Sequence, residues 1–218
     1  MRLQLAWLGL VACAPLVGSG CGSLRGIAYL AAPPQIQKAE FTLTGGSVAV
    51  LIDYARPGQV NPVFDVNLHE RIFEAFRDNK VSARIVAHER VTRLRQANQD
   101  FESWSLQRIG RELNAEQVLH IRIERLLLAE PDDPVVSPSV ELRLKVIAVA
   151  APAVHARLWP PADAEPDGRT VTHNRHPVET GAPDVIDGEA RKLARETGVY
   201  VARHFHKYDL EGTLPREP

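Results

Sequence analysis

The chain has 218 residues, enough for one ordinary domain with a hydrophobic core after removal of a leader. Lys and Arg total 26 against 27 Asp and Glu, a formal net charge of -1. The chain therefore lacks the basic excess that nucleic-acid binding needs. A hydrophobic fraction of 44% and a charged fraction of 24% exclude wholesale disorder and predict a folded domain.

The amino terminus has the features of a secretory signal peptide. Arg2 precedes an apolar run over residues 3–12, which is too short to remain as a membrane-spanning helix. Pro15 and the small residues 18–20 then favour an extended, accessible cleavage segment before Cys21. We expect a signal peptide over residues 1–20.

Residues 16–23 resemble the lipobox of bacterial lipoproteins, in which the cysteine is lipidated and becomes the first residue. This resemblance implies lipidation of Cys21, although Gly18 stands where that family usually has Leu. Residues 10–13 match the tetrapeptide better but leave a very short leader, so Cys13 is the alternative. A third interpretation is an ordinary signal peptide with an incidental cysteine. Gly22, by the same resemblance, is compatible with outer-membrane sorting facing the periplasm, with the inner membrane as the alternative.

The two cysteines also limit the chemistry of the remaining chain. Both precede residue 22, so the folded part has no thiol for a disulfide, a cysteine zinc site or a nucleophile. Pro33 and Pro34 interrupt regular structure. We expect a lipidated cysteine and flexible tether over residues 21–44, one domain over 45–208 and a disordered tail over 209–218.

The first half of the domain predicts a β-α-β unit. Residues 47–53 form a continuous apolar run typical of a buried strand covered on both faces, and residues 83–87 form a second strand. Between them, Asp65 is positioned to cap a helix. Its apolar residues at helical spacing are Leu68, Ile72, Phe73 and Phe76. Residues 88–96 form a short polar helix or loop.

The second half predicts helices around an antiparallel meander. We expect a helix that starts at Ser103 and stops at Asn114. Residues 117–124 and 140–146 alternate apolar and polar side chains, as strands with one solvated face do. Further expected elements are a strand at 154–159, an edge strand at 169–172 and a long helix that opens at residue 187 or 188 and ends near residue 206. The fold class is α/β, a single domain with a mixed sheet and packed helices.

The order of these elements behind a lipidation signal resembles the amino-terminal domain of TolB and related periplasmic lipoproteins of curli secretion and penicillin-binding-protein activation. The resemblance covers residues 47–159, and residues 68–72 and 109–119 lie in the expected order. Because these motifs are hydrophobic patterns, the resemblance implies only an assembly factor or protein-binding module. The chain lacks the propeller repeats of a complete TolB protein.

The polar faces of the two alternating strands are the candidate partner surface, with an ordinary solvated sheet as the alternative. An envelope protein would bind there. A homo-oligomer is a further expected assembly of this chain. The residues are His120, Arg122, Glu124, Glu141, Arg143 and Lys145.

Other polar clusters carry weaker signals. His173 and His176 have metal-ligand character but no diagnostic spacing, and His204 and His206 diverge on a helix. The carboxylate pair at residues 132–133 lies between prolines, as exposed turns do. Trp104 and Trp159 fit either the core or an interface.

We therefore expect a membrane-anchored envelope lipoprotein with no catalytic residue, metal or cofactor. It would act as an assembly or transport-accessory protein through protein contacts. One alternative is a metal-binding or hydrolytic periplasmic enzyme that uses His173 and His176. Another is a structural spacer lipoprotein.

Overall fold

The computed structural model describes residues 35–130, 135–179 and 182–210. The predicted signal peptide, Cys13, Cys21, the two prolines of the tether and the carboxylates at 132–133 lie outside the described residues. So does most of the predicted tail.

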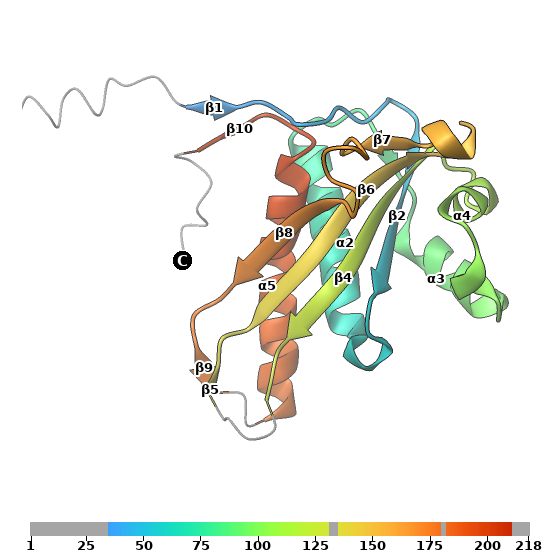
Figure 1. The fold of residues 1–218 in the computed structure, drawn as a ribbon. Coiled ribbons are helices and arrows are strands. Elements are labelled where there is room, and N and C mark those ends of the chain that lie inside the picture. The colour runs from blue at the N-terminus through green and yellow to red at the C-terminus, as the bar shows by residue number, and fades with distance from the viewer. Residues whose placement is uncertain (1–34, 131–134, 180–181, 211–218) are drawn as a thin grey trace, which may run out of the picture.

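A mixed six-stranded sheet forms the centre of the domain (Figure 1). Strand β2 is parallel to β3 and β4, β4 is antiparallel to β6, and both β7 and β8 pair with β6 in antiparallel fashion. The predicted α/β class with a β-α-β start and an antiparallel second half is confirmed. The strands are β3 (Arg84–Ile85), β2 (Ser47–Tyr54), β4 (Gln117–Leu127), β6 (Ser139–Ala148), β7 (Arg157–Trp159) and β8 (Arg169–Asn174).

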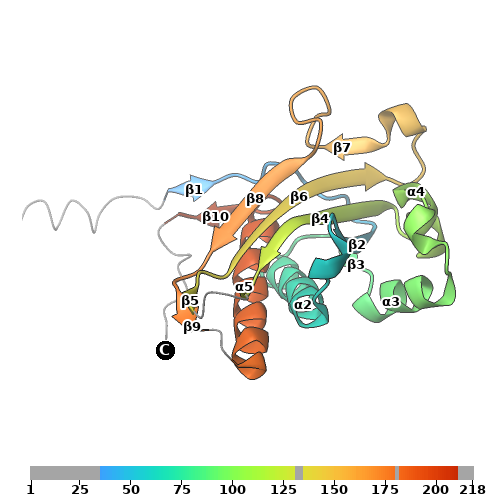
Figure 2. The ribbon, with the colours of Figure 1, turned by 60° about the horizontal axis from the view of Figure 1, so that its bottom comes forward.

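The helices cover the two faces of this sheet unequally. Helices α2 (Pro62–Asp78) and α5 (Pro183–Arg203) lie side by side against one face (Figures 1 and 2). Helices α3 (His88–Ala97) and α4 (Leu106–Glu112), with the 3-10 turn η2 (Phe101–Ser103), cover only part of the other. No helix in the described part of the chain is both long and apolar enough to cross a membrane.

Strand β2 is buried on both sides, as the sequence predicts. Val50 and Ile52 belong to the cluster beneath α2 and α5. Ala49 and Leu51 point the other way, into the smaller cluster beneath α3 and α4. This two-sided burial explains why the strand is an unbroken apolar run rather than an alternating one.

Strand β4 alternates until a β-bulge between Ile123 and Arg125 changes its phase. Ile121 and Ile123 are buried, whereas after the bulge Leu126 and Leu128 are buried instead. A bulge adds one residue to one strand, so it reverses which residues face the core. The strand therefore continues to Leu127, beyond the alternating pattern of residues 117–124.

Helix α2 begins earlier than expected, and the prediction that Asp65 caps it is wrong. The Asn61 side chain accepts a hydrogen bond of 2.9 Å from the Phe64 backbone N–H, and Pro62 occupies the first turn. Proline suits that position because its missing N–H would have no helical partner there. Asp65 lies in the first turn and accepts a 2.6 Å hydrogen bond from the Tyr54 hydroxyl.

The start of α4 also differs from the prediction. Ser103 ends η2, while the Ser105 hydroxyl accepts a 3.2 Å hydrogen bond from the Arg108 backbone N–H and caps the helix. The predicted stop is confirmed, since Asn114 follows the C-cap with a φ of 52°. Asparagine tolerates this left-handed conformation better than most residues.

Several element boundaries shift. Strand β3 is shorter than 83–87, and β7 is shorter than 154–159 because Ala153–His155 forms the 3-10 turn η3. Strand β8 is longer than 169–172, and α5 opens at its own proline rather than at 187 or 188. The segment at 88–96 is helical, which decides between the two predicted alternatives.

The folded body extends beyond residues 45–208. Strand β1 (Ile36–Gln37) pairs with β10 (Tyr208–Asp209), and the Leu43 side chain is 1% exposed in the main core. Residues from the expected tether and tail therefore form part of the fold. A second small pair joins β5 (Val135–Val136) to β9 (Val178–Glu179). The remaining 3-10 turn is η1 (Pro57–Gln59).

Candidate functional site

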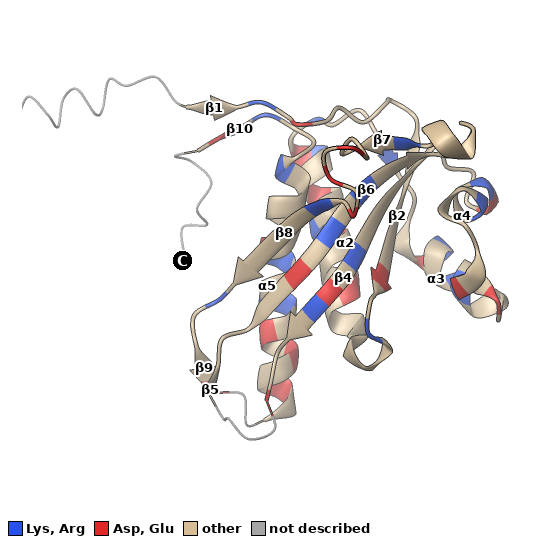
Figure 3. Ribbon diagram, viewed as in Figure 1, with Lys and Arg blue, Asp and Glu red and all other residues tan. Residues whose placement is uncertain are grey.

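The six predicted partner-surface residues lie together on the half of the sheet that the helices leave open. They alternate with buried residues of β4 and β6 that face α2 and α5, so their side chains share the opposite face. Figure 3 shows positive and negative residues interleaved along these two strands. The grouping follows from the period of two and from the antiparallel pairing of the strands.

The register of β4 and β6 places two arginines opposite each other. Arg122 pairs directly with Arg143, while His120 lies opposite Lys145. Like charges in directly opposed positions destabilise a sheet unless acidic groups compensate them. The burial of Lys145 lowers the pKa of its amine, and the neighbouring Arg157 lowers it further.

Two carboxylates compensate the arginine pair. The bulge in β4 leaves Glu124 without a direct cross-strand partner, and its Oε1 lies 3.5 Å from Arg122 Nε and 3.4 Å from Arg143 Nε. Asp167, from the loop before β8, lies 2.9 Å from Arg143 Nη1. These contacts form a dense, mixed-charge surface on the sheet.

A second cluster marks where the open face meets α3. Asp53, at the end of β2, contacts His120 Nε2 at 2.9 Å through Oδ2 and Arg95 Nη2 at 2.7 Å through Oδ1. The roles of Asp53, Arg95 and Asp167 at this surface were not predicted from the sequence. Asp53 carried one usable signal, because it ends an otherwise apolar strand. The partners of Arg95 and Asp167 depend on contacts distant in sequence.

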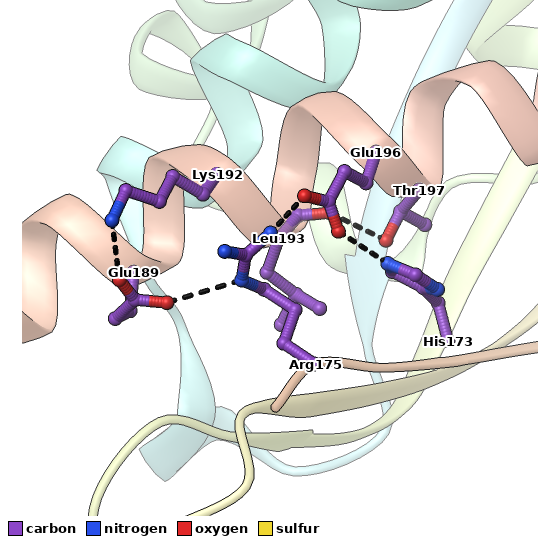
Figure 4. A network of polar contacts seen from close by, with 7 residues as sticks. All are labelled: His173, Arg175, Glu189, Lys192, Leu193, Glu196 and Thr197. Atoms are coloured by element: carbon purple, nitrogen blue, oxygen red, sulfur yellow. Dashed lines mark hydrogen bonds and ion pairs between the residues drawn. The ribbon is translucent and has the colours of Figure 1, made fainter. Parts of the chain in front are cut away.

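The histidine at 173 belongs to a different network, on the α5 side of β8 (Figure 4). His173 Nε2 lies 2.7 Å from Glu196 Oε2, and Arg175 contacts both Glu196 and Glu189. Burial raises the pKa of Glu189, but hydrogen bonds from Lys192 and Arg175 outweigh this effect and lower it overall. These contacts join α5 to β8 and to Arg175, the residue that follows this strand.

The remaining candidate histidines and tryptophans do not form a common site. They lie apart from one another or pack against neighbouring side chains. His176 is exposed, whereas His173 is half-buried against α5. His204 Nδ1 contacts Glu40 at 2.9 Å, and Trp159 is buried at 4% exposure. Trp104 is partly buried, with the Arg108 guanidinium 3.7 Å from its ring. Within the described ranges, no group of three or more His, Cys, Asp or Glu side chains is arranged to hold a metal ion.

No family model matches this chain, and no curated protein matches it either. Among solved structures, it is similar to a PelC dodecamer from Paraburkholderia phytofirmans, with 12% identity, coverage of 80% of this chain and 99% of that one, and a TM-score of 0.37. The lipoprotein GNA1162 from Neisseria meningitidis has 10% identity, coverage of 62% and 86%, and a TM-score of 0.40. The LpoB C-terminal domain from Salmonella enterica has 12% identity, coverage of 63% and 87%, and a TM-score of 0.31. At these values the likeness carries no conclusion about function.

Proposed function

We propose that this chain is a membrane-anchored envelope lipoprotein that acts without catalysis, as an assembly or transport-accessory protein. It binds a protein partner through the open face of β4 and β6. The resemblance of residues 16–23 to a lipobox supports anchoring through Cys21. Anchoring by several acyl chains is effectively permanent, because each buried methylene contributes about 0.8 kcal/mol.

Partner binding is supported mainly by one observation. The part of the sheet that no helix covers carries two opposed arginines whose charges are balanced by Glu124 and Asp167. The polar side chains there contact one another across a broad strand surface rather than converging on a cavity. A fixed pattern of opposite charges selects a complementary protein and guides its encounter, while adding less to raw affinity. We infer a binding surface for a charged protein face.

Crosslinking in intact cells tests this surface. A photoreactive amino acid replaces Arg122 or Lys145 in separate variants, and Arg191, exposed on α5, serves as the matched control position. We expect one reproducible partner at the two sheet positions and no such product at the control. The double variant Arg122→Glu and Arg143→Glu should reduce crosslinking from Lys145 at least tenfold, whereas Arg191→Glu should not. Equal products at all three positions would reject the surface.

The anchor is tested separately by mass spectrometry of membrane-extracted protein. We expect Cys21→Ser to remove both the acyl mass and the membrane association, whereas Cys13→Ser should leave both. Loss in Cys13→Ser alone would move the anchor to that residue. Unmodified wild-type protein would contradict lipidation altogether.

A further inference from the structure

The ends of the folded body meet in a small ribbon formed by β1 and β10. Ile36 pairs with Asp209, and the Leu210 backbone N–H donates a 3.0 Å hydrogen bond to the Gln35 carbonyl. The backbone N–H groups of Glu40 and Phe41 both donate to the His204 carbonyl, which holds the ribbon to the end of α5. The segment leading from the predicted anchor therefore joins the fold at a defined place.

This ribbon combines apolar and basic side chains at the surface. Ile36 is 59% exposed and Leu210 is 51% exposed. Lys38 directly follows β1 and Lys207 directly precedes β10, so both lysines lie next to the paired strands. Both lysines are exposed. Exposed aliphatic groups beside lysines are the composition that membrane-surface segments use.

A hollow beside the ribbon adds to this chemistry. It has a volume of about 370 Å³, and its lining includes Lys38, Arg203 and Tyr208. The Arg203 guanidinium lies 5.1 Å from the Tyr208 ring centroid. Cations next to a tyrosine ring suit the phosphate and glycerol groups at a bilayer interface. The nearby Glu40 is engaged by Arg169 at 2.7 Å and by His204.

Chain length connects this surface to the proposed anchor. Residues 22–34 separate Cys21 from the described structure and reach at most about 45 Å at full extension. The ribbon is the first part of the fold that follows the anchor, so lipidation gives it a high effective concentration at the bilayer. Each lysine near an anionic surface raises membrane affinity only about fivefold. That contribution orients a tethered protein, although it would not recruit a free one.

We propose that the β1–β10 ribbon faces the bilayer and contacts anionic phospholipid headgroups, with Ile36 and Leu210 at the interface. This inference rests on the proposed lipid anchor. In Figure 1 the ribbon lies at one end of the body, so this orientation leaves the broad face of β4 and β6 free for a partner.

Site-specific fluorescence tests the orientation on full-length, lipidated protein in vesicles. Because Cys21 is acylated and Cys13 is removed with the leader, a single introduced cysteine is the only free thiol. Ile36→Cys and Leu210→Cys each carry a polarity-sensitive fluorophore. Val185→Cys is the control, at the far end of α5 and roughly 27 Å along its axis from the ribbon end.

On phosphatidylcholine vesicles containing phosphatidylglycerol, we expect emission at 36 and 210 to shift to shorter wavelength and to be quenched by spin-labelled lipid. Emission at 185 should not change. Lys38→Glu with Lys207→Glu should reduce the shift at least twofold. Identical spectra at all three positions in protein of confirmed acyl mass would overturn this inference and leave the anchor standing. Equal shifts on pure phosphatidylcholine would overturn the headgroup contact, and absence of the acyl mass would overturn both proposals.

Discussion

His69 is an ionisable side chain held in the interior of the protein. It is 4% exposed on α2, and its ring centroid lies 5.0 Å from that of His88. Burial, with a smaller contribution from His88, lowers the pKa of His69 to about 4, although a backbone hydrogen bond with Val86 and the charge of Glu89 act in the opposite direction. The ring is therefore neutral in the folded protein near neutral pH.

This burial makes stability depend on pH. Between pH 6.5 and about 4 the unfolded chain binds a proton at His69 and the folded chain does not, so stability present above pH 6.5 is lost as the pH falls through this range. The expected contribution between pH 7.5 and 4.5 is about 2–3 kcal/mol. Denaturant unfolding of wild type and His69→Asn at both pH values measures it.

A second buried group opposes this effect, so the comparison between variants is what isolates His69. Burial raises the pKa of Asp65 to about 6, hence the folded state holds that proton more strongly and gains stability as the pH falls. His176→Asn, at an exposed position, should keep the wild-type dependence. The same acid sensitivity in His69→Asn as in wild type would contradict the assignment.

At the scale of elements, the packing of α5 against α2 depends on a glycine, Gly198. A Cβ added at Gly198 would lie 2.8 Å from Arg71 Cβ and 2.9 Å from Arg71 Cγ. These distances are shorter than side-chain contacts allow, so a larger residue must push the two helices apart. The sheet cluster beneath both helices would then lose contacts.

We therefore expect Gly198→Leu to lower the free energy of unfolding by at least about 2 kcal/mol, as overpacking does. Gly188→Ala is the matched control, because nothing lies within 4 Å of its added Cβ. In the same helix this change should raise stability by up to about 1 kcal/mol. Thermal and denaturant unfolding of both variants provides the measurement. If Gly198→Leu left the free energy of unfolding unchanged, α5 would be able to move away from α2 without loss of stability.

Regular periodicity predicted the long elements better than the short ones. The strands β4 and β6 and the helix α5 each repeat their pattern over several residues, and all three were predicted with the correct faces. Strand β3 was shorter than expected because His88 already begins helix α3. The residues just before it therefore do not continue the strand, despite their β-propensity. The cap of α2 was misplaced because Asn61 and Asp65 are equally suitable by type, although Pro62 at the first helical position is a sequence signal that favours Asn61.

At the scale of the whole molecule, β4 holds the two halves of the fold together. It pairs with β2 on one side and β6 on the other, while the helices pack on both faces of this central region. We expect the backbone hydrogen bonds of β4 to break only when the whole sheet unfolds. By contrast, α3 buries only Val91 completely.

Amide hydrogen exchange should reflect this arrangement. We expect the slowest exchange at Val118–Ile123 in β4, at rates set by global unfolding, and exchange at least tenfold faster in α3. Mass spectrometry of peptides after timed labelling measures both. Equal protection of α3 and β4 would mean that the domain opens only as one unit.

The candidate surface shows the limit of sequence reasoning at this scale. Alternation alone placed His120, Arg122 and Arg143 on a solvated face, because side chains in a strand must alternate. It did not show that Arg122 and Arg143 oppose each other, since register depends on the bulge and the pairing partner. Nor did it show that Asp53 and Asp167 approach the same face.

By itself the sequence determined local periodicity: an unbroken apolar run for a strand buried on both sides, alternation for strands with one polar face, and an apolar stripe for the long helix. These patterns arise from backbone geometry that each segment carries alone. Only the tertiary structure decided the register of β4 and β6, the uncovered half of the sheet and the joining of β1 to β10. Those features depend on pairings between residues far apart in the chain, which no local pattern encodes.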